Sequence, residues 1–289
     1  MNPVIAWLRN PWGRPRFLPI VAGAYIAWSV LPVAIAILFA FNDGRSRTAW
    51  EGFSLRWFWT DPNLSVFHDS ALQSALKHTL VLALISVLIA TPIGVTLAMG
   101  LQRWRGRGSG TVNVLMLLPL VTPEIVMGVA LLLLFLQVFS AIGIGTTTQA
   151  IGQVTFTISY VVVMVRGRLV SIGPEYEEAA ADLGAPPFSV LVRVLLPLLA
   201  PAILASAAVV FALSIDDFVV TQYLAGDAST TTVSMLLYAS ARGAPTPALN
   251  ALATIALFIT LGTLTLVYFV YRRFAGGGAG AEAVATLEV

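Results

Sequence analysis

The segment EYEEAAADLGAPPFSVLVRVLLP, residues 175–197, lies between two apolar stretches that are each long enough to cross a bilayer. Its first nine residues favour a helix, and acidic side chains come early, where they complement the positive end of the helix dipole. Gly184 is suited to end that helix, and the two prolines after it force a turn. A second short helix is expected from Phe188 to Leu196, and Pro197 marks the start of the next apolar stretch. We therefore predict a knob of two short helices outside the apolar layer.

The overall composition indicates that this chain folds in lipid. Apolar residues make up 58% of its 289 residues and charged residues only 10%, whereas a soluble domain usually carries about 25% charged residues. The mean hydropathy is +0.87. The absence of cysteine excludes disulfides, thiolate metal sites and cysteine nucleophiles. The net charge of +2 comes from arginines at the ends of apolar segments rather than on one face, which favours membrane topology over nucleic-acid binding.

Six apolar stretches have the length that a membrane-crossing helix needs, about 20 residues for a hydrocarbon layer about 30 Å thick. We therefore predict an all-α, polytopic membrane protein with six transmembrane helices. Four prolines would bend the second, third and fifth of these helices. These prolines are Pro92, Pro119, Pro123 and Pro201. The predicted spans cover approximately residues 17–41, 74–101, 111–139, 149–170, 196–223 and 247–271.

The basic residues predict the orientation of these helices. Eleven of them fall in segments that share one side of the membrane, and the other side has five, partly offset by acids. The positive-inside rule therefore places both termini and the segment 175–197 in the cytoplasm. The eleven are Arg9, Arg14, Arg16, Arg103, Arg105, Arg107, Arg166, Arg168, Arg193, Arg272 and Arg273. The five are Arg45, Arg47, Arg56, Lys77 and Arg242.

This topology divides the chain into three parts. Residues 1–16 form a cytoplasmic N-terminus, residues 17–271 form the six-helix domain, and residues 272–289 form a cytoplasmic tail that its glycines make flexible. Within the domain, the cytoplasmic loop covers residues 171–196. The first span is expected to be a retained anchor, because its apolar run is too long for a signal peptide and no small-x-small cleavage site precedes Asn42.

The cytoplasmic loop contains E-A-A from residue 178, a glycine at 184 and L-P ending at residue 197, with Val194 as the aliphatic residue before the L-P pair. This spacing resembles the coupling loop of the membrane subunits of binding-protein-dependent ABC importers, in which isoleucine is usual at the position of Val194. The resemblance implies the type I importer fold. It also implies that five residues couple the chain to an ATPase. These are Glu178, Ala179, Ala180, Gly184 and Pro197.

Three further stretches resemble the spermidine/putrescine permeases of the C type, whose patterns are S-P-D-I-V-M, L-S-M-D-D and N-A-L-A-T. In this chain they read TPEIVM at 122–127, LSIDDF at 213–218 and NALAT at 250–254. The resemblance implies a polyamine permease of the bacterial inner membrane. Its implied partners are a paralogous permease that completes a heterodimer, two ATPase subunits and an extracytoplasmic binding protein. ATP and Mg would be bound by the ATPase, and no cofactor, metal or catalytic site is expected in this chain.

Glu124, Asp216 and Asp217 are acidic residues inside predicted spans. A charge at bilayer depth costs about 3 kcal/mol or more, so such groups face a bundle interior, a partner or an aqueous path. We expect Glu124 near the middle of the third span and the two aspartates near the outer end of the fifth, about 100° apart on the helix. Three acids without an intramembrane lysine or arginine suit a cationic solute. The alternative is a hydrogen-bonded clasp between spans.

The resemblance adds Ser214 and a tryptophan of the first outer segment to the predicted solute pathway. Trp57 is the preferred tryptophan, and Trp59 competes with it. Its ring would attract an alkyl-ammonium chain by a cation–π interaction. The family pattern has aspartate where this chain has Glu124, so the charge is kept with a longer reach.

Three classes of function compete. A permease driven by a separate ATPase fits best, because the chain contains no G-x-x-x-x-G-K-[ST] phosphate loop. Ferric iron and thiamine are alternative solutes, since their permeases share the E-A-A loop. A self-contained secondary transporter or cation channel would also use Glu124 and Asp216, but it leaves the loop at Glu178 without a role. An intramembrane enzyme is disfavoured, because no nucleophile–base pair or metal-ligand set is found.

Overall fold

The computed structural model describes residues 17–46, 49–104, 106–242 and 246–275. These residues form helices joined by loops, and the one pairing of extended backbone among them is a bridge between Asn42 and Phe53. The predicted all-α class is confirmed. The helices are α2 (Phe17–Ala40), η1 (Arg56–Thr60), α3 (Ser70–Arg103), α4 (Ser109–Val121), α5 (Glu124–Gln137), α6 (Thr146–Ile172), α7 (Glu175–Asp182), α8 (Pro187–Val190), η2 (Leu191–Leu195), α9 (Leu196–Asp216), α10 (Val219–Tyr223), η3 (Ala228–Thr230), α11 (Val233–Arg242) and α12 (Pro247–Ala275).

Some of the sequence predictions fall outside the described residues. They concern the N-terminal segment 1–16, with its three arginines, and the glycine-rich tail from residue 276 onward. Arg47 and Arg105 also fall in the gaps. The predicted division of the chain into a short N-terminus, a helical domain and a tail therefore stays a prediction at both ends.

Five helical segments are long and apolar enough to cross a membrane. Four of them are α2, α3, α6 and α12, and the fifth runs from Pro187 to Asp216 through α8, η2 and α9. The pair α4 and α5 supplies a sixth crossing when it is counted as one span. These six segments match the six predicted stretches in order and approximate position.

The third predicted span, residues 111–139, is not the single bent helix that the sequence suggested. It divides into α4 and α5, which meet at an angle of 109°. Thr122 adopts an extended backbone, with ψ 129°, because the ring of Pro123 disfavours the helical region for the residue before it. The hydroxyl of Thr122 donates to the carbonyl of Leu118 at 2.7 Å and so helps to satisfy the end of α4. The proline here breaks the span rather than curving it.

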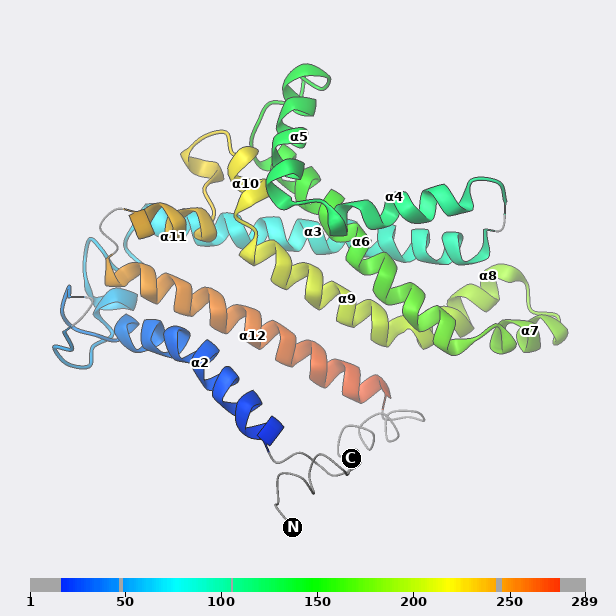
Figure 1. Ribbon diagram of the computed structural model, residues 1–289, viewed down its shortest axis with the longest axis horizontal. Coiled ribbons are helices and arrows are strands. Elements are labelled where there is room, and N and C mark those ends of the chain that lie inside the picture. Colours follow the sequence, from blue (N-terminus) through cyan, green and yellow to red (C-terminus); the bar gives the residue numbers. More distant parts are fainter. Residues whose placement is uncertain (1–16, 47–48, 105, 243–245, 276–289) are drawn as a thin grey trace, which may run out of the picture.

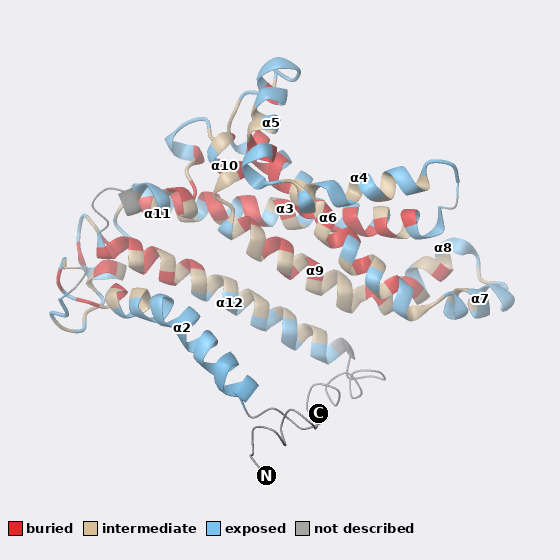
Figure 2. Cartoon of the chain, in the orientation of Figure 1, coloured by how far each residue is buried: buried red, intermediate tan, exposed pale blue. Residues whose placement is uncertain are grey.

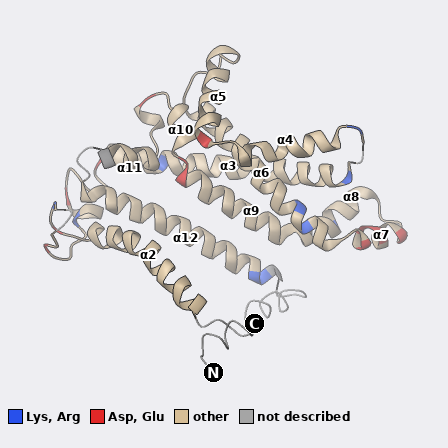
Figure 3. Ribbon diagram, in the orientation of Figure 1, with Lys and Arg blue, Asp and Glu red and all other residues tan. Residues whose placement is uncertain are grey.

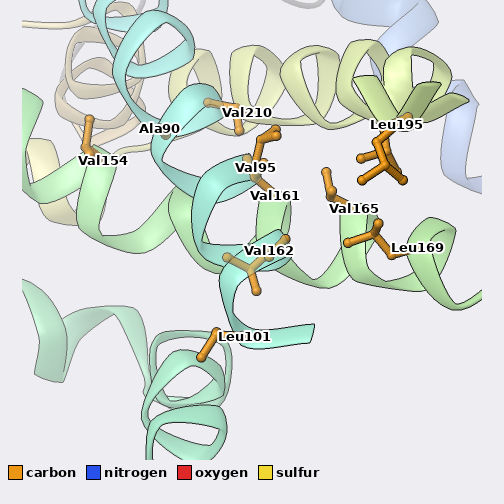
Figure 4. Close-up of a cluster of buried hydrophobic side chains, with 12 residues drawn as sticks. Ala90, Val95, Leu101, Val154, Val161, Val162, Val165, Leu169, Leu195 and Val210 are labelled. Carbon is orange, nitrogen blue, oxygen red and sulfur yellow. The ribbon is translucent and has the colours of Figure 1, made fainter. Parts of the chain in front are cut away.

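Helices α3, α6 and α9 pack on one another and form the centre of the molecule (Figure 1). Helix α12 packs on α9, and α2 packs on α12 at the edge of the bundle. On the opposite side α5 and α10 pack together and project from the centre, while α7 and α8 extend from one end. Buried aliphatic side chains join the three central helices (Figure 4). They include Ala90 and Val95 on α3, Val161 and Val165 on α6, and Leu195, Leu199 and Val210 on η2 and α9.

Close backbone approach stabilises the central packing, because lipid is as apolar as the helix surfaces and van der Waals contact must replace the hydrophobic effect. Gly94 on α3 faces Val161 on α6, and a Cβ atom at position 94 would lie 2.5 Å from the Val161 Cβ. A larger residue at position 94 would push the two helices apart. By contrast, no residue in the most apolar stretch of α2 is buried, and Figure 2 shows this helix exposed along most of its length.

Charged residues collect near the ends of the long helices (Figure 3). Arg103 ends α3, and Arg166 and Arg168 lie near the end of α6, which leads directly into α7. Helix α12 ends with Arg272 and Arg273 in its last turn. The described basic residues therefore gather mainly at the end of the bundle to which α7 belongs, and the cytoplasmic location of that end stays a prediction.

Candidate functional sites

Helix α7 ends in the way that the sequence predicts. Gly184 has a φ of +79°, a left-handed conformation that glycine adopts without a Cβ clash. Its N–H donates to the carbonyl of Ala181 at 2.8 Å, and the N–H of Ala185 donates to the carbonyl of Ala180 at 3.1 Å. These two bonds form a Schellman motif, which satisfies the last carbonyls of the helix and turns the chain. Any other residue at position 184 would strain this turn.

The second short helix of the loop is not separate from the span that follows. Pro187 opens α8 in its first turn, and the helix then continues to Asp216. A π-helical turn, η2, precedes Pro197, and the N–H of Leu196 donates to the carbonyl of Leu191. Pro197 has no N–H for the regular ladder, and the wider turn before it absorbs that interruption. Pro197 therefore lies inside a continuous helix and does not mark the start of a span.

The surface of α7 and the turn after it is not covered by the rest of the described chain. Glu178 and Ala179 are exposed, and Ala180 is half-buried. Leu183 and Phe188, two large apolar side chains, are 89% and 76% exposed. An exposed apolar patch beside acidic residues is typical of a site for another protein. The structure thus brings four of the five predicted coupling residues to one exposed knob, and leaves Pro197 at the base of the following helix.

Helix α7 has few attachments to the central bundle. Arg103, the last residue of α3, forms an ion pair with Glu177 in the first turn of α7. Beside this pair a cavity of about 500 Å³, also lined by Glu178, lies between α7 and the ends of α3 and α6. An exposed ion pair contributes at most about 1 kcal/mol. The main packing contacts of α7 with other helices are with α8 and η2, which lead directly into α9.

Asp216 and Asp217 lie where α9 ends, not inside a helix that continues to residue 223. Asp216 is the last residue of α9, and Asp217 has an extended backbone with ψ 116°. The short helix α10 follows. The Asp217 carboxylate caps it, because its Oδ1 accepts the N–H of Val220 at 3.1 Å. The expectation of two helical neighbours about 100° apart is therefore wrong.

The two aspartates face different surroundings. Asp216 is exposed and lines a cavity of about 420 Å³ between α9, α11 and α12. The lining is mostly aliphatic, and Ser234 and Thr260 are the other polar residues in it. Asp217 is half-buried and bonds to α6. One carboxylate therefore meets a cavity, and the other joins helices.

Glu124 is the first residue of α5 and is exposed, so it does not lie in the middle of a continuous third span. It follows the 109° bend directly, in the first turn, where a carboxylate complements the helix dipole. Helix α5 packs on α10 through Met127, Val220 and Leu224. Helix α10 begins directly after Asp217 and Phe218, so this packing places α5 beside the end of α9. The break in the third span and the end of α9 are therefore neighbouring features.

Gln153 on α6 organises the junction between the α4–α5 break and the end of α9, and it is not among the residues that the sequence singles out. The residue is 2% exposed. Its Oε1 accepts hydrogen bonds from the hydroxyls of Ser86 on α3, at 2.9 Å, and of Ser214 on α9. Its Nε2 donates to the carbonyl of Ser214 at 3.2 Å and to Oδ2 of Asp217 at 3.3 Å. Ser214, predicted to line the solute pathway, is 3% exposed and belongs to this buried network.

Gln149 forms a second network one turn earlier on α6. Its Nε2 donates to the carbonyls of Thr221 and Thr230, each at 2.9 Å, and its Oε1 lies 2.8 Å from Nε2 of His78. Because the amide nitrogen faces two acceptors, Oε1 must accept, and Nε2 of His78 carries a proton. A sequence signal existed for both glutamines. Residues four apart share a helix face, and polar residues within a span normally face the bundle interior.

Trp57 lies in the core of the loop after α2. Its side chain is 0% exposed, and its Nε1 donates to the carbonyl of Asn42 at 2.6 Å. The guanidinium of Arg56 lies 5.1 Å from the ring centroid, so the cation beside this ring belongs to the chain itself. The ring of Trp57 is thus buried in this arrangement, and its predicted contact with the solute stays a prediction. Trp59, which is 64% exposed, is the competing tryptophan with an accessible ring.

The same loop contains Asp61, whose carboxylate accepts two backbone hydrogen bonds and forms an ion pair. Oδ1 of Asp61 accepts the backbone N–H groups of Asn63 and Leu64 at 3.1 and 3.0 Å. Its Oδ2 pairs with Nε of Arg56 at 3.0 Å. The bond from Asn63, the bond from Leu64 and then the pairing with Arg56 hold the pKa of Asp61 below its ordinary value of 3.8.

Comparison with known proteins assigns the family. The profile of binding-protein-dependent transport system inner membrane components matches residues 90–276, which include α7, both aspartates and both buried glutamines. This chain belongs to that family. The permease is 34% identical over 268 residues to the putrescine transport system permease protein PotI of Escherichia coli K12, covering 91% of this chain and 90% of PotI. It is also 34% identical over 257 residues to the spermidine/putrescine transport system permease protein PotC of the same strain, covering 89% of this chain and 94% of PotC.

Solved structures place the fold of this permease among ABC importers. A bacterial ABC transporter involved in the import of the acidic polysaccharide alginate matches with a TM-score of 0.71 and 18% identity, covering 89% of this permease and 95% of that chain. The MetNI methionine ABC transporter, in an inward-facing conformation, matches with a TM-score of 0.55 and 18% identity, covering 70% of this permease and 93% of that chain. The predicted importer fold and inner-membrane location are confirmed.

Proposed function

We propose that this permease is the membrane-spanning subunit of a polyamine importer, which couples ATP hydrolysis by a separate subunit to the inward movement of putrescine or spermidine. One observation carries the proposal, the 34% identity to PotI and PotC over about nine-tenths of the chain. Those relatives are named for putrescine and for spermidine/putrescine transport. The acidic residues of this chain supply a chemical reason why it would carry the same class of solute.

A polyamine consists of ammonium groups joined by methylene chains, so its path needs carboxylates beside apolar surface. Asp216 presents a carboxylate to a mostly aliphatic cavity whose lining contains no lysine or arginine. Glu124 presents a second exposed carboxylate beside the same junction. Removing an ammonium from water costs free energy unless an opposite charge replaces the water. A solute would therefore pass between these carboxylates as it loses hydration.

The coupling mechanism follows from the position of α7. The arginine asymmetry favours a cytoplasmic α7, where an ATPase would contact it, and Glu178 would pair with a basic residue of that partner. ATP binding would close the ATPase dimer and draw the α7 helices of two permeases together. Because α7 contacts α8 and η2, the displacement would enter α9, which ends at Asp216. Hydrolysis would then return the bundle to the inward-open arrangement.

We propose four partner subunits for the complete importer. They are a paralogous permease, two ATPase subunits that bind ATP and Mg, and an extracytoplasmic binding protein. The alginate transporter has been solved in complex with a periplasmic protein bound to an alginate pentasaccharide, which supports the last partner by analogy.

The test is uptake of radiolabelled putrescine and spermidine by the reconstituted complex in liposomes. We expect uptake that requires ATP on the ATPase side, and no uptake by this chain alone. An excess of ferric iron or thiamine should not compete. Competition by either one would assign a different solute to the same permease. Uptake by the isolated chain without ATP would contradict the proposal and favour a self-contained transporter or channel.

A further inference from the structure

The side chain of Gln153 uses its full hydrogen-bonding capacity in the middle of the bundle. A primary amide offers two lone pairs on oxygen and two N–H groups. Here the oxygen accepts from two serine hydroxyls, and the nitrogen donates to the carbonyl of Ser214 and to the carboxylate of Asp217. The amide has one orientation that works, because a carbonyl and a carboxylate only accept. A fully satisfied buried network of this kind rigidifies the groups that it joins.

This network fixes Asp217 from several directions. Its Oδ2 accepts from Gln153, and its Oδ1 accepts the N–H of Val220. Its backbone carbonyl accepts from the hydroxyls of Thr221, at 2.8 Å, and of Ser234, at 2.7 Å. The carboxylate of Asp217 is therefore held toward α6 and α10. It is not free to turn toward the cavity that Asp216 lines.

We propose that Gln153 is a positioning residue that assigns different tasks to the two adjacent aspartates. It holds Asp217 as the brace between α6, α9 and α10, and so leaves Asp216 as the carboxylate that meets the solute's ammonium group. This inference rests on the proposed polyamine uptake and goes beyond it. It assigns the solute contact to Asp216 and not to Asp217, although the two residues look equivalent in the sequence. Gln153 produces this difference because it holds Asp217 in place.

A designed repulsion and its relief test the contact directly. Gln153→Glu would turn a carboxylate oxygen toward Oδ2 of Asp217 and toward the carbonyl of Ser214, where no donor remains. Breaking a buried hydrogen bond in this way should lower maximal uptake about tenfold or more. Measurement at about pH 8 limits proton sharing between the two carboxyls. Adding Asp217→Asn restores a donor opposite the new carboxylate at position 153, so the double variant should recover most of the uptake of Asp217→Asn alone.

Asp216→Asn is the matched control, because it neutralises the adjacent carboxylate without touching Gln153. On the Gln153→Glu background it should give no recovery. As a single variant it should raise the KM for polyamine about tenfold, whereas Asp217→Asn should leave the KM within about twofold of the unmodified complex. Equal recovery from both asparagine variants, no recovery from Asp217→Asn, or a KM increase that follows Asp217 would each overturn the proposal.

A second readout separates this inference from the proposed solute. The melting temperature of the purified complex should fall in Gln153→Glu and rise again when Asp217→Asn is added, but not when Asp216→Asn is added. This measurement needs no solute. If the unmodified complex takes up no polyamine, the proposed function fails, and the pattern of melting temperatures still decides whether Gln153 holds Asp217. A melting temperature that does not recover with Asp217→Asn overturns the inference alone.

Discussion

The knob at α7 and the junction at the end of α9 are built by opposite means. The knob depends on hydrogen bonds between residues a few positions apart, such as the bond from Ala185 to Ala180, and its side chains are largely exposed. The junction depends on bonds between residues 61 to 67 positions apart, which converge on the buried Gln153. The exposed knob is therefore specified by local contacts, whereas the charged junction is specified by contacts across the whole bundle.

Among the local contacts of the knob, we expect the largest effect from a substitution of Gly184. Gly184→Val places a β-branched residue at a φ of +79°, which costs at least about 1–2 kcal/mol and is relieved only if the turn changes direction. We expect the complex to lose nearly all uptake and to release its ATPase, while membrane insertion persists. Co-purification of the ATPase and liposome uptake measure this outcome.

Gly167→Val is the control for that variant. Gly167 lies within α6, and a Cβ atom there would meet no heavy atom within 4 Å. The two substitutions therefore add the same side chain with and without backbone strain. If Gly184→Val transported normally, the knob would not depend on its Schellman turn.

The long-range hydrogen bonds of the bundle can be tested by a substitution of Gln149. Gln149→Leu removes the donor from the carbonyls of Thr221 and Thr230 and the acceptor from His78. Unpaired buried groups of this kind should destabilise the fold by about 2–5 kcal/mol in total. Thermal unfolding of the purified complex measures this loss. Gln137→Leu, at an exposed position on α5, should change the melting temperature little, and equal shifts in the two variants would argue against the buried network.

The close packing of α3 on α6 predicts that alanine substitutions at two glycines of α3 change the melting temperature in opposite directions. Gly94→Ala forces a Cβ against Val161, and overpacking costs about 1–3 kcal/mol. Gly100→Ala meets no atom within 4 Å and should instead stabilise α3 by up to about 1 kcal/mol through helix propensity. We therefore expect the first variant to lower the melting temperature and the second to raise it slightly. Two shifts of the same sign would contradict close contact at Gly94.

The smallest expected effect is a local one, at Asp61. Its pKa in the folded protein lies below the ordinary value of 3.8, so the folded state favours the ionised form. The resulting stabilisation is complete well above pH 3.8 and is lost as the pH falls through the lower, folded-state pKa. Between about pH 5 and about pH 3 the melting temperature should therefore fall more steeply in the unmodified chain than in Asp61→Asn. Parallel curves would show that this carboxylate contributes no pH dependence.

The same contrast explains how much of the molecule the sequence predicts. The six apolar stretches, the helix at 175–182 and the role of Gly184 as its last cap are visible because each depends on composition or on nearest neighbours. The prolines of the third span predict a bend but not the 109° break at Thr122, since a proline signals an interruption but not its angle. For a similar reason the sequence does not predict the π-helical turn before Pro197 or the end of α9 at Asp216.

The acidic residues of the candidate site are visible in the sequence, but their different surroundings are not. Glu124, Asp216 and Asp217 stand out as charges in apolar surroundings, so their selection needed no structure. Their unequal surroundings could not be derived, because Asp217 is distinguished from its neighbour by an amide 64 residues away. The family resemblance favours Trp57 over Trp59, yet the Trp57 ring is buried and the Trp59 ring is exposed. Long-range contacts decide such cases.

The π-helical turn at residues 191–195 also determines how α9 is rotated about its own axis relative to α7. Each residue of an α-helix advances the winding by about 100°, so one extra residue in a turn rotates the whole of α9 relative to the knob by roughly that amount. The wider turn therefore determines that the face of α9 with Ser214 points toward α6 for the given position of α7. Conversion of that single turn to regular α-helix would rotate Asp216 about the helix axis. The distance between the two ends of the helix would change little.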